Sequence, residues 1–427
     1  MKTKLFLLPL LLICLFGCEQ SETSTLNVEL SETNEVSMYE KSTEDMFDFM
    51  KQVYPAKYAK YYPIKNQFKP EILTKVSNNN FAKYAKSTTD ENIIDTLLYI
   101  VNFGEDDGFA VMDANNGDLL VLTEKGDLHA EDLTQEYNID DSEIEPKEMM
   151  AYLLNSRSIT PPPSFGGDPI DPNKPDIIMV GDWTTKYQVE PLVKVKFNQR
   201  DPYNRRCCDG EGNICPAGCV AIAVIQVMSA NKCPNTIGNL TYNWDTIINN
   251  YKTDTSSQNV LASWIRTIGE QCNMIYSTDG SSAYTTDAKN CFSLYPQYKN
   301  VTIDYNPNKD EVYSMLSNGK SMYFSGSRVD STHNPIDTCG HAWVVDGCIY
   351  QEQNVTTTTI YGAVISKYTN YRNYVHCNWG WGGSCDGYYF LNAFNLKNGA
   401  EIQDPNTNSG SMNRYYRLHI RSIMYNL

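Results

Sequence analysis

A run of ten almost wholly apolar residues, from Cys219 to Met228, constrains this chain more than any other segment. Gly218 stands before the run and Pro234 follows soon after it, so the run fits a helix of about three turns and is too short to span a bilayer. A helix that is apolar on all sides has to be buried on all sides, which only a sizeable domain allows. We therefore expect residues 218–229 to form the central helix of a domain.

Charges and cysteines divide the chain into two parts. The 427 residues carry a net charge of −16, and residues 187–427 hold 19 basic and 19 acidic residues, so the whole excess lies in residues 1–186. Eleven of the 13 cysteines fall instead between Cys207 and Cys385. This asymmetry predicts two domains, and the acidic balance argues against a nucleic-acid partner.

The N-terminus has the pattern of an export signal. Two lysines precede an apolar run over residues 5–16, and Leu-Phe-Gly before Cys18 resembles a bacterial lipobox. We expect residues 1–17 to be a lipoprotein signal peptide, Cys18 to carry lipid, and residues 18–40, rich in Ser, Thr and Glu, to form a solvated tether. The predicted location is the outer membrane or cell surface, and release of the mature domain to the outside of the cell is a further expectation. An ordinary secretory signal with an incidental cysteine is the alternative.

The first domain is predicted to be a small α+β unit over residues 41–157. Apolar spacing and turn residues indicate two helices and three antiparallel strands, over residues 46–54, 146–154, 97–103, 108–112 and 119–122. Residues 158–186 begin with a stretch rich in Pro and Gly, including Pro-Pro-Pro and Gly-Gly, and are predicted to form an exposed linker.

The second domain, residues 187–427, is predicted to be α+β as well. One buried helix is followed by a late run of strands, over residues 322–324, 341–345, 363–368, 374–379 and 388–391.

Three residues suited to thiol chemistry stand in separate segments. Cys219 begins the apolar helix, where the N-terminal N–H groups and partial positive charge favour a thiolate. His341 precedes an apolar strand that would hold its ring, and Asn378 precedes Trp-Gly-Trp-Gly-Gly. A nucleophile, a base and an orienting amide form one arrangement for acyl transfer. These residue types alone are a weak indication, because most exported chains contain them.

Four local segments make the indication strong. Asn-Gln-Arg-Asp-Pro-Tyr-Asn at 198–204, Ala-Gly-Cys-Val-Ala at 217–221, Gly-His-Ala-Trp-Val-Val-Asp-Gly at 340–347 and Asn-Trp-Gly-Trp-Gly-Gly at 378–383 occur in order. Together they resemble the signature segments of the streptopain family of papain-like bacterial cysteine peptidases. The resemblance implies a papain-like peptidase domain preceded by an inhibitory propeptide with an antiparallel sheet.

The resemblance also implies roles for individual residues. Cys219 would be the nucleophile and His341 the general base and then the general acid. Gln199 would donate a side-chain N–H beside the Cys219 backbone N–H, and the two would form the oxyanion hole. Asn378 would orient His341, and Trp379 would shield that pair.

Substrate contacts and partners follow from the same resemblance. Ser282 and Gly340 would contact bound peptide, beside an apolar pocket for a substrate residue next to the cleaved bond. The expected partners are protein or peptide substrates, the chain's own propeptide as an intramolecular inhibitor, and the membrane through the lipid. Neither a cofactor nor a metal is expected.

The resulting hypothesis is an exported cysteine endopeptidase, made as an inactive zymogen and acting through an acyl-enzyme. Maturation is expected in the linker near Lys186-Tyr187, with Arg157 also available. Two alternatives stay open: a surface-binding lipoprotein that keeps the fold without catalysis, and an enzyme that transfers the acyl group to an amine.

The second domain contains ten cysteines besides Cys219, and an exported chain favours disulfides, so up to five bridges are expected. Four of them stand near the proposed catalytic residues in sequence, and a bridge pinning these loops is expected: Cys207, Cys208, Cys215 and Cys339. A redox lock on Cys219 is a further hypothesis. A zinc site is disfavoured because the usual paired spacing is missing.

Other residues near the motifs are expected to have structural roles. His376 is predicted to pack or hydrogen-bond, and Asp346 to form a turn before Gly347. Trp343 and Trp381 are predicted to be core aromatics. The three remaining histidines are expected on the surface or in turns: His129, His333 and His419.

Overall fold

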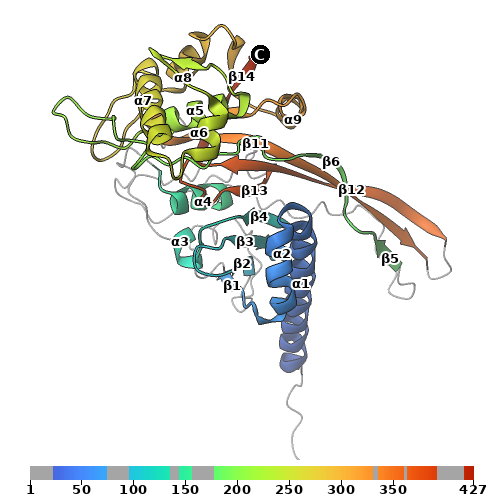
Figure 1. The fold of residues 1–427 in the computed structure, drawn as a ribbon. Coiled ribbons are helices and arrows are strands. Elements are labelled where there is room, and N and C mark those ends of the chain that lie inside the picture. The colour runs from blue at the N-terminus through green and yellow to red at the C-terminus, as the bar shows by residue number, and fades with distance from the viewer. Residues whose placement is uncertain are drawn as a thin grey trace, which may run out of the picture.

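One antiparallel sheet of twelve strands joins the two predicted domains in the computed structural model (Figure 1). The structure describes residues 23–74, 96–134, 144–155, 177–329, 335–359, 363–391 and 418–427. The strand order is β1-β2-β3-β4-β13-β12-β11-β10-β14-β9, and β5 and β6 pair with β11. In Figure 1 the helices α5 to α8 lie above strands β11 to β13, and β1 to β4 lie below these strands together with α1 and α2.

The elements have the following bounds. The helices are α1 (Thr23–Val53), α2 (Pro55–Tyr61), the 3₁₀ helix η1 (Tyr62–Gln67), α3 (Ala130–Thr134), α4 (Pro146–Asn155), α5 (Cys219–Asn231), α6 (Trp244–Asn250), α7 (Thr255–Gln271), α8 (Thr285–Ser293) and α9 (Lys309–Ser317). The strands are β1 (Glu71–Thr74), β2 (Thr96–Asn102), β3 (Phe109–Asp113), β4 (Leu119–Thr123), β5 (Ile177–Val180), β6 (Thr184–Val189), β7 (Thr236–Ile237), β8 (Leu240–Thr241), β9 (Lys299–Asp304), β10 (Met322–Val329), β11 (Pro335–Thr358), β12 (Val364–Asn378), β13 (Gly387–Phe390) and β14 (Leu418–Asn426).

Strands β2, β3 and β4 are buried on both faces, which explains their nearly continuous apolar sequences. On one face Phe47 and Met50 of α1 pack with Tyr99 and Met112 in one hydrophobic core. On the other face Val111 belongs to a second core, which continues through α4 into the helices of the C-terminal part. The predicted meander and both predicted helices are confirmed here, within one or two residues at most ends of the strands and of α4.

Helix α1 is longer than predicted and takes in most of the expected tether. It begins at Thr23, whereas the sequence analysis predicts a solvated segment over residues 18–40. Core packing around Met46 and Phe47 holds these turns of the helix in place, so they act as the helix nucleus. Extending the helix from this nucleus adds one backbone hydrogen bond for each further residue. No helix among the described residues is long and apolar enough to cross a membrane.

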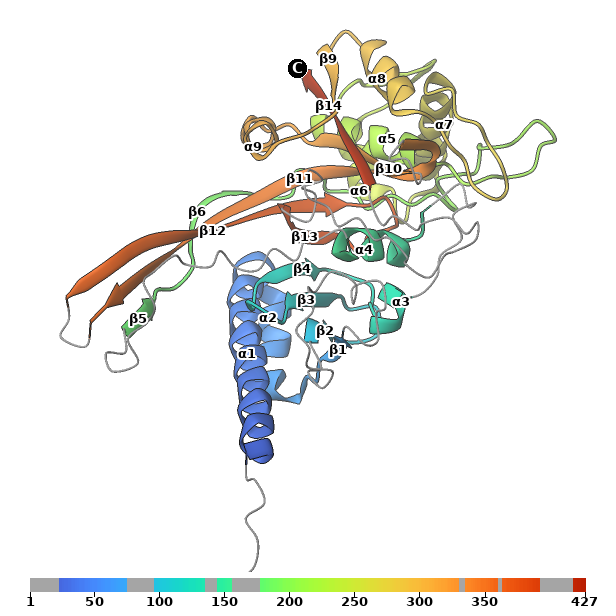
Figure 2. The ribbon, with the colours of Figure 1, turned by 180° about the vertical axis from the view of Figure 1, so that it is seen from behind.

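The predicted linker is partly a strand. Residues 177–180 and 184–189 form β5 and β6, which pair with β11 along the long β11–β12 hairpin (Figure 2). Thr185 lies opposite Gln351 and Tyr187 opposite Tyr350, so Lys186 is the extra residue of a β-bulge. The Lys186-Tyr187 bond therefore lies in a paired strand, and not in the exposed linker that was predicted. Arg157 and residues 158–176 lie outside the described residues.

The two parts of the chain meet where β4 pairs with β13. Leu122 lies opposite Tyr388, and Thr123 opposite Gly387. A Cβ atom at Gly387 would lie 2.3 Å from the Leu122 carbonyl oxygen, so this close approach requires glycine. The N-terminal part is thus held as additional strands of the sheet of the C-terminal part.

Candidate active site

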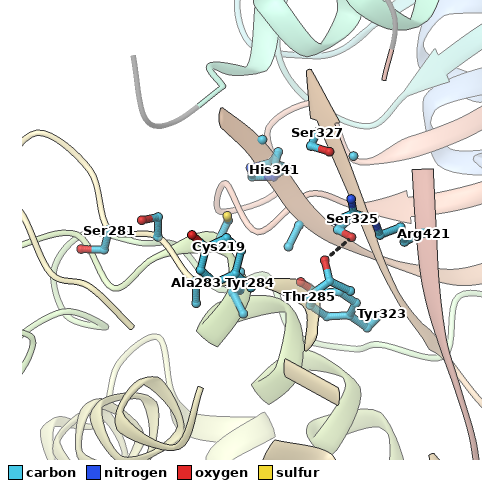
Figure 3. Close-up of a pocket in the computed structure, with 15 residues that line it drawn as sticks. Cys219, Ser281, Ala283, Tyr284, Thr285, Tyr323, Ser325, Ser327, His341 and Arg421 are labelled. Atoms are coloured by element: carbon cyan, nitrogen blue, oxygen red, sulfur yellow. Dashed lines mark hydrogen bonds between the residues drawn. The ribbon is translucent and has the colours of Figure 1, made fainter. Parts of the chain in front are cut away.

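Cys219 and His341 line one pocket, although 122 positions separate them in the sequence. One wall of the pocket consists of residues 281–285, and the opposite wall comes from β10 and β11. Figure 3 shows the Cys219 sulfur pointing toward the His341 ring. The structure therefore brings the predicted nucleophile and the predicted base together.

Helix α5 places Cys219 at its first position. Gly218 caps the helix with φ 84°, a left-handed conformation that favours glycine, and an added Cβ would also lie 2.8 Å from Met274. The Gly218 carbonyl accepts the first helical hydrogen bond, from Ile222 N–H at 3.1 Å. The Cys219 side chain thus stands among the unsatisfied N–H groups of the helix N-terminus, which stabilise negative charge on sulfur.

Strand β11 and the turn after β12 fix the His341 ring. Its Nε2 lies 2.8 Å from the Trp379 carbonyl oxygen, and a carbonyl can only accept, so Nε2 carries the proton. The Nδ1 atom is buried and has no hydrogen-bond partner among the described residues. Burial lowers the pKa of His341 to about 4, against the smaller opposing effect of the Trp379 carbonyl. The ring is therefore neutral at pH 7, with an Nδ1 lone pair available to accept a proton.

The orienting contact comes from a backbone carbonyl, which corrects the expected role of Asn378. The Asn378 amide donates to the Val195 carbonyl at 2.9 Å, and its oxygen accepts from Gly380 N–H at 3.2 Å. Asn378 thus anchors the turn that presents the Trp379 carbonyl to His341. Gly380, with φ 75°, allows the chain to reverse directly after that carbonyl.

Trp381, and not Trp379, stacks directly on the His341 ring. The His341 and Trp381 ring centroids are 4.3 Å apart at an interplanar angle of 27°. The ring centroids of Trp379 and His341 are 6.2 Å apart. Trp379 instead stacks on Trp381, with 5.6 Å between the ring centroids. Trp381 is partly buried and packs against the hydrophobic core, so the prediction of a core aromatic holds in part for it and fully for the buried Trp343.

A backbone hydrogen bond holds Gln199 near Cys219. Its carbonyl accepts from Ala217 N–H at 2.8 Å, two residues before Cys219, and the Gln199 residue is buried. Ser282 and Gly340 both line the pocket, and their contacts to substrate stay a prediction. A Cβ at Gly340 would lie 2.5 Å from the Gly326 carbonyl oxygen, so glycine is needed for β11 to pair with β10 here.

A buried charge cluster lies behind the site and was missed by the sequence analysis. Asp346 is not a turn former: it is fully buried in β11, accepts from Val193 N–H at 2.9 Å, and lies 2.6 Å from His376 Nδ1. The other His376 nitrogen lies 3.5 Å from Glu124, which also pairs with Lys196. Although burial opposes it, these carboxylates raise the pKa of His376 to about 10. The predicted hydrogen-bonding role of His376 is confirmed.

The cysteines differ from prediction. All ten that the structure describes are thiols, and none of the expected bridges is found among them. Eight of the ten, Cys219 included, are buried, and the other two are partly buried. Buried thiols behave as small apolar side chains, which explains their place in the core. Cys18 and His333 lie outside the described residues. His129 is partly exposed beside Glu71, as expected, whereas His419 lies in β14.

An α+β domain with a thiol at a helix N-terminus, facing a buried imidazole on a sheet, has the architecture of a papain-like cysteine peptidase. Residues 197–389 match the model of the peptidase C10 family. The match covers this C-terminal segment of the chain, and the resemblance to streptopains is confirmed there.

The relatives found are distant in amino-acid sequence. Streptopain from Streptococcus pyogenes is 23% identical over 258 residues, which are 48% of this chain and 57% of the relative. The chain thus spans little more than half the length of these relatives. The thiol protease/hemagglutinin PrtT from Porphyromonas gingivalis is 22% identical over 343 residues, 70% of this chain and 34% of that protein. A fragment of Prevotella intermedia prointerpain A superposes with a TM-score of 0.48 and 20% identity, covering 84% of this chain and 98% of that one.

Proposed function

We propose that this protein is an exported cysteine endopeptidase made as an inactive zymogen. The observation that carries the proposal is the shared pocket of Cys219 and His341, in which the histidine keeps a buried Nδ1 lone pair. A binding scaffold has no need of a neutral, desolvated imidazole held in one tautomer next to a helix-terminal thiol.

The reaction follows from these positions. His341 Nδ1 accepts the Cys219 proton, and the thiolate attacks the substrate carbonyl carbon. The oxyanion that forms is bound by the Cys219 backbone N–H and the Gln199 side-chain N–H. The tetrahedral intermediate collapses to an acyl-enzyme, and His341 returns the proton to the leaving amine. Water, activated by His341, then hydrolyses the thioester.

The contacts between the N-terminal part and the peptidase domain support the proposed inactive zymogen. Besides the β4–β13 pairing, Glu124 N–H donates to the Asp386 carbonyl at 2.7 Å, and Lys125 accepts from Cys385 N–H at 3.1 Å. These bonds hold the loop after Trp379, whose carbonyl orients His341. The N-terminal part therefore contacts the support of the catalytic histidine from behind, while every described residue that lines the pocket belongs to the peptidase domain.

Substitution of the nucleophile tests the proposal, with a second thiol as control. Cys219→Ala should abolish both hydrolysis of azocasein and cleavage of the chain itself. Cys208→Ala removes a half-buried thiol outside the pocket and should keep both. Iodoacetamide followed by mass spectrometry should label Cys219 in the processed chain. Hydrolysis that survives in Cys219→Ala would refute the proposal.

Export and lipid attachment rest on the sequence of residues 1–18. Metabolic labelling with a palmitate analogue should mark the wild-type chain in a bacterial host, and Cys18→Ser should remove the label. A labelled Cys18→Ser chain, or an unlabelled wild type in the membrane fraction, would contradict lipidation at Cys18.

A further inference from the structure

Two buried cysteines meet between helices α7 and α8. Cys272 is the C-cap residue of α7, and Cys291 lies near the end of α8, which runs beside α7 in both views of the fold (Figure 1 and Figure 2). Both residues are fully buried in one hydrophobic core. Their thiols are hydrogen-bonded to each other, and the Cys291 sulfur also lies 3.6 Å from Gln271 Oε1. The two sulfur atoms are therefore direct neighbours.

This proximity distinguishes the pair from the cysteines that the core explains by itself. Cys348 and Cys377 are also fully buried, on the adjacent strands β11 and β12. They do not lie opposite each other, because Val375 is opposite Cys348 and Val345 is opposite Cys377. A buried thiol without a neighbouring sulfur acts as a small apolar side chain. Two thiols in contact can in addition form a covalent bond.

The folded core keeps these thiols unreactive. The hydrogen bond with Cys291, together with burial, raises the pKa of the Cys272 thiol well above its usual value. Exchange between thiols and disulfides proceeds through the thiolate, so a neutral thiol enclosed in a core reacts slowly with oxidants. A bridge at this site therefore has to form while the chain folds, and the compartment in which the chain folds decides whether it forms.

We propose that Cys272 and Cys291 are oxidised to a disulfide when the chain folds outside the cytosol. The proposal rests on the export proposed above and does not depend on peptidase activity. One cysteine attacks a sulfur atom of an external disulfide, RS–SR, and releases one RSH; the other cysteine then attacks the mixed disulfide and releases the second RSH. The two protein thiols lose two electrons and two protons, and RS–SR takes up both.

Such a bridge would join the two ends of a loop that carries one wall of the pocket. Residues 281–285 line the pocket and lie between the two cysteines in sequence. Within this loop Ile275 and Ser282 exchange backbone hydrogen bonds at 2.9 and 3.0 Å. The Ser281 hydroxyl donates to the Pro216 carbonyl at 2.7 Å, which attaches the wall to the segment before α5. The disulfide would add a covalent link at the base of the same wall.

Peptide mapping detects the bridge, because trypsin cuts between the two cysteines at Lys289. Digestion gives residues 267–289, which contain Cys272, and residues 290–299, which contain Cys291. The chain from residue 19 onward, with Cys219→Ala, would be produced in one bacterial host with an oxidising cytosol and in another with a reducing cytosol. Thiols are alkylated in denaturant before digestion without reductant. We expect the two peptides to be linked in the product of the oxidising host alone, and to separate on reduction.

Cys348 and Cys377 serve as controls within the same digests. Both should be alkylated in the products of both hosts, which shows that the reagent reached buried thiols. Alkylated Cys272 and Cys291 in the product of the oxidising host would overturn the inference.

The full-length Cys219→Ala chain separates failure of this inference from failure of export. When recovered from the membrane fraction, it should contain the same linked peptides. A full-length chain that stays in the cytosol, with linked peptides in the product of the oxidising host, would refute export and leave the pairing standing. Alkylated Cys272 and Cys291 in a chain from the membrane fraction would overturn the inference.

Thermal unfolding measures what the bridge contributes. Closing a loop of about 20 residues should raise the Tm of the oxidised chain above that of the reduced chain by about 5–10 °C. This difference should vanish in Cys291→Ala and persist in Cys348→Ala. Because each difference is taken within one variant, the cavity that alanine leaves in the core does not affect it. Equal Tm values for the linked and unlinked chains would refute the stabilising role of the bridge.

Discussion

Replacing Glu124 by Gln should loosen the attachment of the N-terminal part. The Glu124 carboxylate is 28% exposed and lies between Lys196 and His376, both from the peptidase domain. Although burial alone would raise it, these two cations lower the pKa of Glu124 from 4.5 to about 2. Glutamine keeps the size of the side chain and removes the charge on which this pairing depends.

The size of the effect follows from the pKa. A pKa of about 2 in the attached state against 4.5 in the detached state corresponds to about 3 kcal/mol, or at least about a hundredfold in the opening equilibrium. Because the pKa is lower in the attached state, this stabilisation is complete above pH 4.5. It is lost as the pH falls from 4.5 toward about 2, where the carboxylate becomes protonated.

Hydrogen exchange of β4 measures this opening directly. In a Cys219→Ala background, which prevents self-cleavage, Glu124→Gln should speed exchange of the β4 amides by roughly a hundredfold at pH 7. Asp106→Asn is the matched control, because the Asp106–Lys125 pair is more than half exposed on both sides and should contribute less than about 1 kcal/mol. A Glu124→Gln effect no larger than that of the control would refute the electrostatic reasoning.

Two further predictions concern catalysis. Gln199→Ala should lower kcat by about 10²–10³ while Cys219 still reacts with iodoacetamide, because one oxyanion donor is lost and the nucleophile is kept; an unchanged kcat would exclude Gln199 from the oxyanion hole. Trp381→Ala exposes the His341 ring, whose pKa burial lowers to about 4. The neutral base should then be lost at a higher pH, so the acid limb of the kcat/KM profile should move up toward 6.5, whereas an unmoved limb would show that Trp381 does not control the burial of the ring.

The position of Cys219 was predictable because the local sequence there determines the local structure. The apolar run after Gly218 can only be a buried helix, and it places Cys219 at a helix N-terminus without further information. The pairing with His341 depends on the register between β10 and β11, which no local pattern encodes, and only the family motifs indicated it.

The errors have a common physical origin in contacts between distant segments. Asp346-Gly347 has the composition of a turn, yet Asp346 is buried in a strand because His376 and Val193 N–H satisfy its carboxylate. Trp381 has the sequence context of a core aromatic, and only the reversal at Gly380 brings it over His341. The late strand β14 escaped prediction because its partners β9 and β10 lie about 90 residues or more upstream.

The seam between β4 and β13 has a consequence for any mature form of the enzyme. In the proposed maturation, a cut between α4 and β5 that releases the N-terminal part would leave β13 as the edge strand of the remaining sheet, with backbone N–H and C=O groups turned toward solvent. The proposed activation would thus expose a strand edge that the precursor keeps paired. At four residues, beginning with a glycine, β13 offers little length for a foreign strand to add to, which limits self-association of the activated molecule.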